Sequence, residues 1–141
     1  MKHFIVERKD IYGNTEYLSV LTENDCEYNC SLSKALLVSE NEKKLIRKIA
    51  RKNYLRNPTF IPLKSFPLLG QKALSILHEY DCDFLVDILT YSRNEGELGK
   101  ELLKAATDDE RNVITYAELS DKVAHMLIEK YDLKKKENYS W

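Results

Sequence analysis

The chain is poor in the residues that interrupt secondary structure, with four glycines and three prolines among 141 residues. Long flexible linkers are therefore not expected, because such linkers are rich in glycine, proline or serine. Three cysteines are an odd number, which argues against a secreted disulfide framework. No apolar run approaches the roughly 18 residues of a membrane span, and charges come too early in the chain for a signal peptide. We expect a cytoplasmic protein with reduced thiols.

Motifs of catalysis are absent as well. The sequence has no nucleophile elbow, no phosphate-cradling glycine loop and no paired-histidine metal motif. The three histidines, His3, His78 and His125, are scattered along the chain. We therefore predict no catalytic residues and no cofactor. An enzyme whose site is assembled from residues distant in sequence is the third of three functional alternatives.

What the chain does contain is a reversal of charge. Residues 43–78 include nine lysines and arginines and no acidic residue. Residues 79–121 include twelve carboxylates and four basic residues. The formal net charge of −1 therefore combines a basic segment with an acidic one. Such an asymmetry bears on partners, because it sets the potential that a partner meets at long range.

The first residues have the pattern of a β-hairpin. Residues 3–8 and 16–21 are rich in β-branched and aromatic side chains, and Gly13-Asn14 between them can supply the positive φ of a turn. Residues 22–30 are predicted to form a loop or an irregular edge strand. Residues 31–38 fit either a helical turn or a third strand.

A capping box predicts the next element. In Ser39-Glu40-Asn41-Glu42 the serine can accept from a free amide while Glu42 reaches back, which predicts a helix from there to about Asn53. Helical spacing places Leu45, Ile46, Ile49 and Ala50 on one apolar arc and the cations on the remainder. The predicted cationic face, with one residue beyond the helix, consists of Lys43, Lys44, Arg47, Lys48, Arg51, Lys52 and Arg56.

After that helix, residues 59–64 read as a short strand. Pro62 lacks an amide donor, which favours the edge of a sheet. From about residue 66 the pattern becomes helical, and a second capping box stands at 115–118. The expected helices cover residues 69–80, 83–91, 97–106 and 115–131, of which the second holds the apolar positions Phe84, Leu85, Ile88 and Leu89.

These elements predict an α+β protein. We expect a small antiparallel sheet with one basic amphipathic helix, packed beside a bundle of three to four helices. The predicted organisation is a mixed module at 1–65, a helical module at 66–133 and a fraying tail at 134–141.

The acidic segment has two interpretations. Spaced carboxylates can imitate a phosphate backbone and thereby block a nucleic-acid-binding site on another protein. Acids near helix starts are also ordinary helix chemistry, because the helix dipole favours them there. The candidate mimic face consists of Asp81, Asp83, Asp87, Glu95, Glu97 and Glu101.

A zinc site is a further hypothesis. Cys26 and Cys30, together with His78 and Cys82, supply four ligands of the types that tetrahedral zinc binds. The two pairs lie far apart in sequence, and the first lacks the two-residue spacing of a zinc knuckle. Cysteine is also simply a small buried residue, so the prediction for bound metal is none.

The first 65 residues resemble a module of small accessory proteins from phages and mobile elements of AT-rich Gram-positive bacteria. The resemblance consists of Phe4-Ile5-Val6, Tyr17-Leu18, Ser33-Lys34-Ala35, the Ser39–Glu42 box with its Lys/Ile helix, and Phe60–Leu63. It implies an accessory protein that binds and inhibits a host factor such as a defence nuclease, in the manner of an anti-CRISPR. It covers under half of the chain and carries no functional residue over.

The leading hypothesis is therefore a non-enzymatic inhibitor that binds a bacterial protein, and that occludes or mimics a nucleic-acid surface. The alternative is direct nucleic-acid binding through the cationic face. That face can equally be a solvated surface, or dock on the acidic half of the same chain. A membrane partner is not expected, because the apolar arc carries no Phe or Trp and is needed to cover the sheet.

Overall fold

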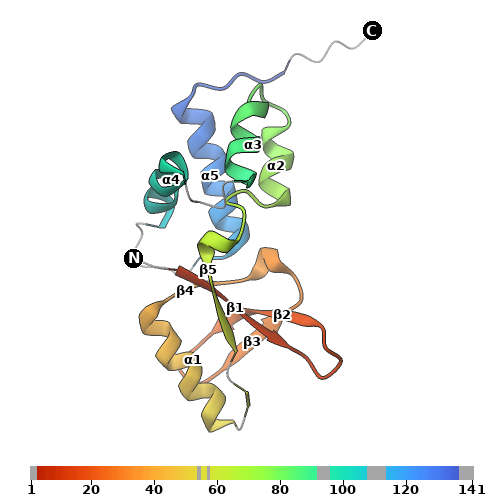
Figure 1. Ribbon diagram of the computed structural model, residues 1–141, viewed down its shortest axis with the longest axis vertical. Coiled ribbons are helices and arrows are strands. Elements are labelled where there is room, and N and C mark those ends of the chain that lie inside the picture. The colour runs from red at the N-terminus through yellow and green to blue at the C-terminus, as the bar shows by residue number, and fades with distance from the viewer. Residues whose placement is uncertain (1–2, 54, 57, 92–95, 108–113, 137–141) are drawn as a thin grey trace. The chain divides into compact units, whose positions relative to one another are not determined.

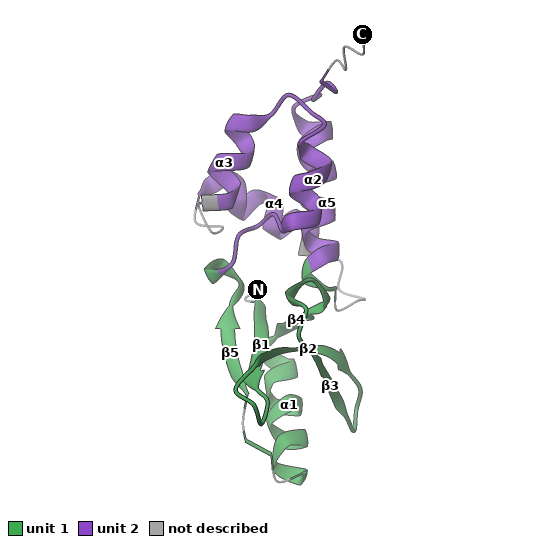
Figure 2. Ribbon diagram, turned by 90° about the vertical axis from the view of Figure 1, so that its right-hand side faces the viewer, with its two compact units in different colours: residues 1–65, 111–116 green, residues 66–110, 117–141 purple. Residues whose placement is uncertain are grey.

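The computed structural model divides the chain into two compact units (Figures 1 and 2). Unit 1 comprises residues 1–65 and 111–116, and unit 2 comprises residues 66–110 and 117–141. The division after residue 65 coincides with the boundary expected from the sequence. The residues that the structure describes are 3–53, 55–56, 58–91, 96–107 and 114–136.

Unit 1 is a five-stranded antiparallel sheet with one α-helix, which confirms the α+β class. The strands are β1 (His3–Lys9), β2 (Thr15–Leu21), β3 (Cys26–Asn29), β4 (Leu37–Ser39) and β5 (Thr59–Pro62). The helix is α1 (Glu40–Lys52), and two short 3-10 helices are η1 (Leu32–Lys34) and η2 (Leu63–Ser65).

Strand β1 is the centre of the sheet. Its second half pairs with β2 and its first half with β4, while β5 pairs along Phe4–Glu7. Because Phe4 and Ile5 pair with both β4 and β5, these two strands lie on opposite sides of β1. Among the described strands, β5 pairs with β1 alone, so the edge position indicated by Pro62 is confirmed.

The turn of the β1–β2 hairpin is organised by an aspartate as well as by the predicted glycine. Gly13 has a φ of 81°, a conformation that glycine adopts without strain. The carboxylate of Asp10 accepts hydrogen bonds from the amides of Tyr12 and Asn14, each at 2.8 Å. The carboxylate thus satisfies two amides that the turn leaves without a strand partner, and these bonds hold the turn closed.

Each of the two segments with ambiguous sequence patterns contains a strand. Residues 31–38 hold η1 followed by the start of β4. Residues 22–30 contain β3, which pairs with β2 through a register shift between Leu18 and Val20. β3 is therefore an irregular edge strand, one of the two predicted alternatives.

The core of unit 1 lies between α1 and one face of the sheet (Figure 1). Phe4 and Val6 of β1, Leu18 of β2 and Val38 of β4 are buried together with Ile46 of α1. Phe4 and Val6 are two residues apart on β1, so their side chains lie on the same face of the strand. The apolar arc predicted for α1 is thus the face that packs on the sheet.

Residues 114–116 belong to unit 1, which corrects the assignment of 66–133 to one helical module. The amide of Leu37 donates to the carbonyl of Ile114 at 2.8 Å, and that of Tyr116 donates to the carbonyl of Ala35 at 2.7 Å. Leu36 and Thr115 form an antiparallel bridge between these bonds. Sequence patterns did not predict this pairing of residues 114–116 with unit 1, because a single bridge between distant segments leaves no periodicity in the sequence.

Unit 2 contains four helices among the described residues: α2 (Gln71–Leu77), α3 (Asp83–Tyr91), α4 (Glu97–Thr107) and α5 (Tyr116–Lys130), the last of which begins at the final residue of unit 1. Its buried side chains include Leu77, Leu85, Leu89, Leu102 and Leu119. Ser120 is a buried polar residue of this core, and its hydroxyl joins α5 to the start of α2. It accepts from the amide of Gly70 at 2.9 Å and donates to the carbonyl of Leu68 at 3.2 Å.

The first residues of the predicted tail are paired with the rest of unit 2. The amide of Asp81 donates to the carbonyl of Lys134 at 3.0 Å, and the amide of Lys136 donates to the carbonyl of Glu79 at 2.8 Å. Tyr80 and Lys135 form the antiparallel bridge between them. Fraying is therefore the wrong description for residues 134–136, while residues 137–141 lie outside the described part of the chain.

None of the helices within the described ranges is long and apolar enough to cross a membrane.

The packing of α1 on the sheet predicts a large cost for truncating Ile46. This side chain is 1% exposed, and Ile46→Ala leaves a cavity, so we expect a loss of about 2–5 kcal/mol in the free energy of unfolding. Lys48→Ala, on the exposed side of the same helix, should change that free energy by no more than about 0.5 kcal/mol. Urea unfolding followed by circular dichroism measures both. Equal losses in the two variants would show that α1 does not pack through Ile46.

Candidate interaction surfaces

Helix α1 positions the predicted cationic face, and its start is fixed by the predicted capping box. The amide of Ser39 donates to Oε1 of Glu42 at 3.0 Å, and the Ser39 hydroxyl donates to the same oxygen at 2.8 Å. These bonds satisfy groups at the helix terminus that have no partner within the helix. The capping box therefore determines the residue at which the helix begins. Helical periodicity then determines which side chains face outward.

Lys43 lies at the border between the apolar and cationic faces, and it does not point freely into solvent. Its Nζ atom is 3.6 Å from the centroid of the Phe4 ring and 5.3 Å from that of Phe60. The same ammonium lies 3.5 Å from the carboxylate of Glu40, and the Lys43 side chain is 15% exposed. The charge of Lys43 is thus largely engaged by an aromatic ring and a carboxylate.

Five cations are exposed along α1 and make no ion pair with a described residue, and four of them also make no contact with a described aromatic ring: Lys44, Lys48, Arg51 and Lys52. We call them the α1 cationic row. They recur at intervals that keep them on one side of a helix, and they span about 12 Å along its axis. Arg47 is also exposed, and its guanidinium carbon lies 5.1 Å from the centroid of the Phe60 ring. Arg56 is exposed beyond the end of the helix.

The predicted acidic face is less uniform than its sequence suggests. Asp83 pairs with Lys136 at 3.3 Å, and Glu101 pairs with Lys130 at 2.8 Å. Asp81, Asp87 and Glu97 are exposed and form no ion pair with the described residues. Glu95 lies outside the described part of the chain. Two of the six predicted carboxylates are therefore already paired with lysines of their own unit, in pairs that are exposed to solvent.

Glu101 belongs to a shallow groove between α4 and α5. The groove has a volume of about 320 Å³ and is lined by Leu102, Ala105, Met126 and the charged residues Glu101, Glu129 and Lys130. The hydrogen bond from Lys130 to Glu101 joins the two helices at this groove and raises the pKa of Lys130. The carboxylate of Glu101 is thus already bound to Lys130, so it is less able to imitate a free phosphate charge.

The four side chains considered for zinc are divided between the two units. Cys26 packs against the core of unit 1, and Cys82 is buried in unit 2, where its thiol donates to the carbonyl of Leu77 at 3.4 Å. Burial raises the pKa of both thiols. All three cysteines are free, and within the described ranges no three His, Cys, Asp or Glu side chains come together in a way that could hold a metal ion.

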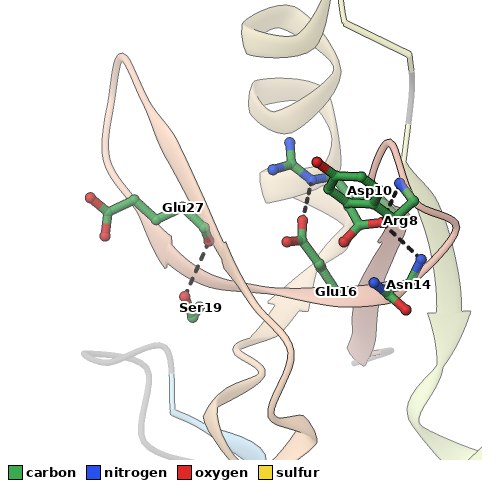
Figure 3. A network of polar contacts seen from close by, with 7 residues as sticks. Arg8, Asp10, Asn14, Glu16, Ser19 and Glu27 are labelled. Carbon is green, nitrogen blue, oxygen red and sulfur yellow. Dashed lines mark hydrogen bonds and ion pairs between the residues drawn. The ribbon is translucent and has the colours of Figure 1, made fainter.

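A polar network on β1, β2 and β3 was not anticipated (Figure 3). Arg8 lies opposite Glu16 in the antiparallel register, and its Nε donates to that carboxylate at 3.0 Å. The guanidinium carbon of Arg8 also lies 3.8 Å from the centroid of the Tyr28 ring. Burial raises the pKa of Tyr28 to about 12. Tyr28 also packs against the core cluster of unit 1 that contains Ile46 of α1.

Each unit exposes one pair of neighbouring large apolar side chains, in addition to the single residues Val20, Leu55 and Tyr131. Ile11 and Tyr12, at the tip of the β1–β2 hairpin, are 91% and 83% exposed. Phe84 and Ile88, on α3, are 64% and 53% exposed. Sequence periodicity predicted both members of the second pair as apolar helix positions and did not distinguish them from Leu85 and Leu89, which are buried.

Comparisons with models of protein families, with curated proteins and with solved structures found no match to this chain.

The raised pKa of Tyr28 predicts a loss of stability at high pH. A phenol whose pKa rises from 10.0 to about 12 on folding favours the folded state fully below pH 10, and this contribution is lost as the pH rises through about 12. Part of the Tyr28 side chain meets solvent, which screens the effect, so we expect a contribution on the order of 1 kcal/mol.

Tyr28→Phe tests this prediction. The free energy of unfolding of this variant should fall less between pH 10 and 12 than that of the wild type. Tyr12→Phe, at the exposed hairpin tip, is the matched control and should follow the wild type. Parallel curves for the wild type and Tyr28→Phe would show that Tyr28 does not titrate abnormally.

Proposed function

We propose that this chain is a non-enzymatic nucleic-acid-binding protein, and that the α1 cationic row contacts the phosphate backbone. The observation that carries this proposal is the composition of the exposed face of α1. Lys44, Lys48, Arg51 and Lys52 stand there without a carboxylate partner in the described chain, and no large apolar side chain of α1 is exposed. For this face, these features favour direct nucleic-acid binding over the binding and inhibition of a bacterial protein.

The chemistry of the face explains the preference. Protein interfaces depend on buried apolar and aromatic side chains at their centre, and α1 presents none outward. Phosphate contacts need only cations and hydrogen-bond donors. Duplex DNA carries one charge for about every 1.7 Å of its axis, so a row of about 12 Å can face several phosphates.

Packing also holds the row in a fixed orientation. The opposite side of α1 buries Ile46, Ile49 and Ala50, so the helix cannot rotate without exposing them. Lys43 is fixed on Phe4 and Phe60, which ties the first turn of α1 to β1 and β5. A cationic row on a rigid element loses less entropy on binding than the same charges on a mobile tail.

We expect the wild type to bind a short labelled DNA duplex with strong salt dependence. Four phosphate contacts predict a loss of about 100-fold in affinity between about 50 and 200 mM salt. The triple variant Lys44→Gln, Lys48→Gln, Arg51→Gln removes three contacts and should lower the slope of log affinity against log salt by about 2.7. Fluorescence anisotropy at several salt concentrations measures both quantities.

A matched control uses three exposed lysines of unit 2. The variant Lys72→Gln, Lys104→Gln, Lys122→Gln makes the same change of net charge on other elements. It should keep the wild-type slope. Equal slopes for the two triple variants would reject a site on α1. If α1 instead docks on carboxylates of the same chain, the first triple variant will lower the free energy of unfolding, and the wild type will not bind the duplex.

The inhibitor hypothesis remains a second proposal, in which the chain binds a nucleic-acid-binding protein of a bacterial host, such as a defence nuclease. The observation that favours it is the exposure of Asp81, Asp87 and Glu97 without an ion pair to the described residues. The odd number of cysteines supports a cytoplasmic setting for either proposal.

Competition tests the inhibitor proposal. If carboxylates imitate phosphates, a bacterial DNA-binding protein captured by the wild type should be released by free duplex DNA. The variant Asp81→Asn, Asp83→Asn, Asp87→Asn should fail to capture it, since it lacks the charges. Capture that resists DNA, or that survives the triple substitution, would contradict mimicry by these residues.

A further inference from the structure

The exposed side of α3 carries an apolar pair. Phe84 and Ile88 lie four residues apart, which makes them neighbours on the helix surface. They are 64% and 53% exposed, whereas Leu85 and Leu89 on the inner side are buried. The helix therefore holds its place in unit 2 through the leucines. The exposed pair contributes little to that packing.

Two carboxylates run beside the apolar pair. Asp83 and Asp87 are also four residues apart, each directly before one of the apolar residues, and both are exposed. Asp87 makes no ion pair with the described residues. Asp83 pairs with Lys136 at 3.3 Å, and the side chain of Asp83 is 77% exposed and that of Lys136 41% exposed. We call these four residues, Phe84, Ile88, Asp83 and Asp87, the α3 patch.

The α3 patch has the anatomy of a protein interface rather than of a phosphate mimic. Neighbouring large apolar side chains in water are unfavourable, and a partner that covers them recovers the hydrophobic free energy. Charged groups at the rim then select the partner and its orientation. A surface that imitated phosphates alone would not need Phe84 and Ile88.

We propose that the α3 patch is a docking surface for a protein segment that forms a basic amphipathic helix. The apolar side of that segment packs on Phe84 and Ile88, and its lysines or arginines pair with Asp83 and Asp87. The segment must be basic, because Asp83 and Asp87 border the apolar pair and a bound segment would lie against both carboxylates. This binding site is separate from the α1 cationic row and would exist whether or not α1 binds a duplex.

A second copy of the chain is a poorer occupant. Its most cationic element is α1, and the exposed face of α1 presents no large apolar side chain to match Phe84 and Ile88. A nucleic acid is excluded by sign, because its phosphates would meet Asp83 and Asp87. The complementary partner is therefore another protein that carries both cations and apolar side chains on one helix.

The experiment uses a labelled synthetic helix of leucine and lysine, whose leucines recur every three to four residues, and the full chain. Fluorescence anisotropy should show that the wild type binds this peptide. Phe84→Gln with Ile88→Gln should weaken binding by about tenfold or more, because apolar anchors dominate such interfaces. Asp87→Asn should weaken binding by a smaller factor and reduce its dependence on salt.

The hairpin tip offers a matched control. Ile11 and Tyr12 are likewise neighbouring and exposed, so Ile11→Gln with Tyr12→Gln removes a similar apolar area from unit 1. This variant should bind the peptide as the wild type does. The substituted side chains in both double variants lie on the surface, so circular dichroism should show unchanged folding. A peptide with glutamate in place of lysine should not bind.

Three outcomes would overturn the proposal. The wild type could fail to bind the leucine–lysine peptide. The two double variants could bind it as tightly as the wild type while Asp87→Asn weakens binding, which would mean that charge without an apolar site explains the binding. Sedimentation could show that the wild type self-associates and that Phe84→Gln with Ile88→Gln abolishes this, which would assign the patch to a second copy. Loss of duplex binding in the α1 variants has no bearing on this test.

Discussion

The burial of the apolar face of α1 on β1 is the interaction on which unit 1 depends. Ile46 shares a core with Phe4 and Val6, and those two residues belong to the one strand that pairs with β2, β4 and β5. The side chains that hold the helix therefore stand on the strand that holds the sheet. Because helical periodicity places the cations opposite the buried face, the same packing displays the α1 cationic row to solvent.

The two exposed surfaces differ in the kind of partner that they fit. The α1 cationic row offers charge without apolar area, which suits a phosphate backbone. The α3 patch combines Phe84 and Ile88 with Asp83 and Asp87, which suits a protein. A protein that carried both activities could bring a basic partner and a nucleic acid together, or could hold that partner away from its own nucleic acid.

Local pairing accounts for part of the charge reversal along the chain. Asp83 and Glu101 each pair with a lysine of unit 2, and Lys43 is held by Phe4 and Glu40 in unit 1. Charges counted along a sequence therefore overstate the field that a partner meets. Fewer unpaired charges remain in the described chain than the sequence indicates: on α1 the α1 cationic row and Arg47, and among the predicted acidic residues Asp81, Asp87 and Glu97.

The sequence by itself determined the features that depend on neighbours along the chain: the hairpin, the capped start of α1 at Ser39, the edge position of Pro62 and the helices of unit 2. It also predicted the cationic face, because the apolar and basic arcs of α1 do not overlap. No local signal places Lys43 against Phe4, so the predicted face included a lysine whose charge is engaged within unit 1.

Only the tertiary structure decided which apolar positions are covered. Phe84, Leu85, Ile88 and Leu89 fall on one arc of about 140° at helical spacing, so periodicity cannot divide them. The surrounding core of unit 2 covers the leucines and leaves the other two in solvent. The bridge between Leu36 and Thr115 likewise joins segments far apart in sequence. Both depend on contacts between distant residues, which local patterns do not encode.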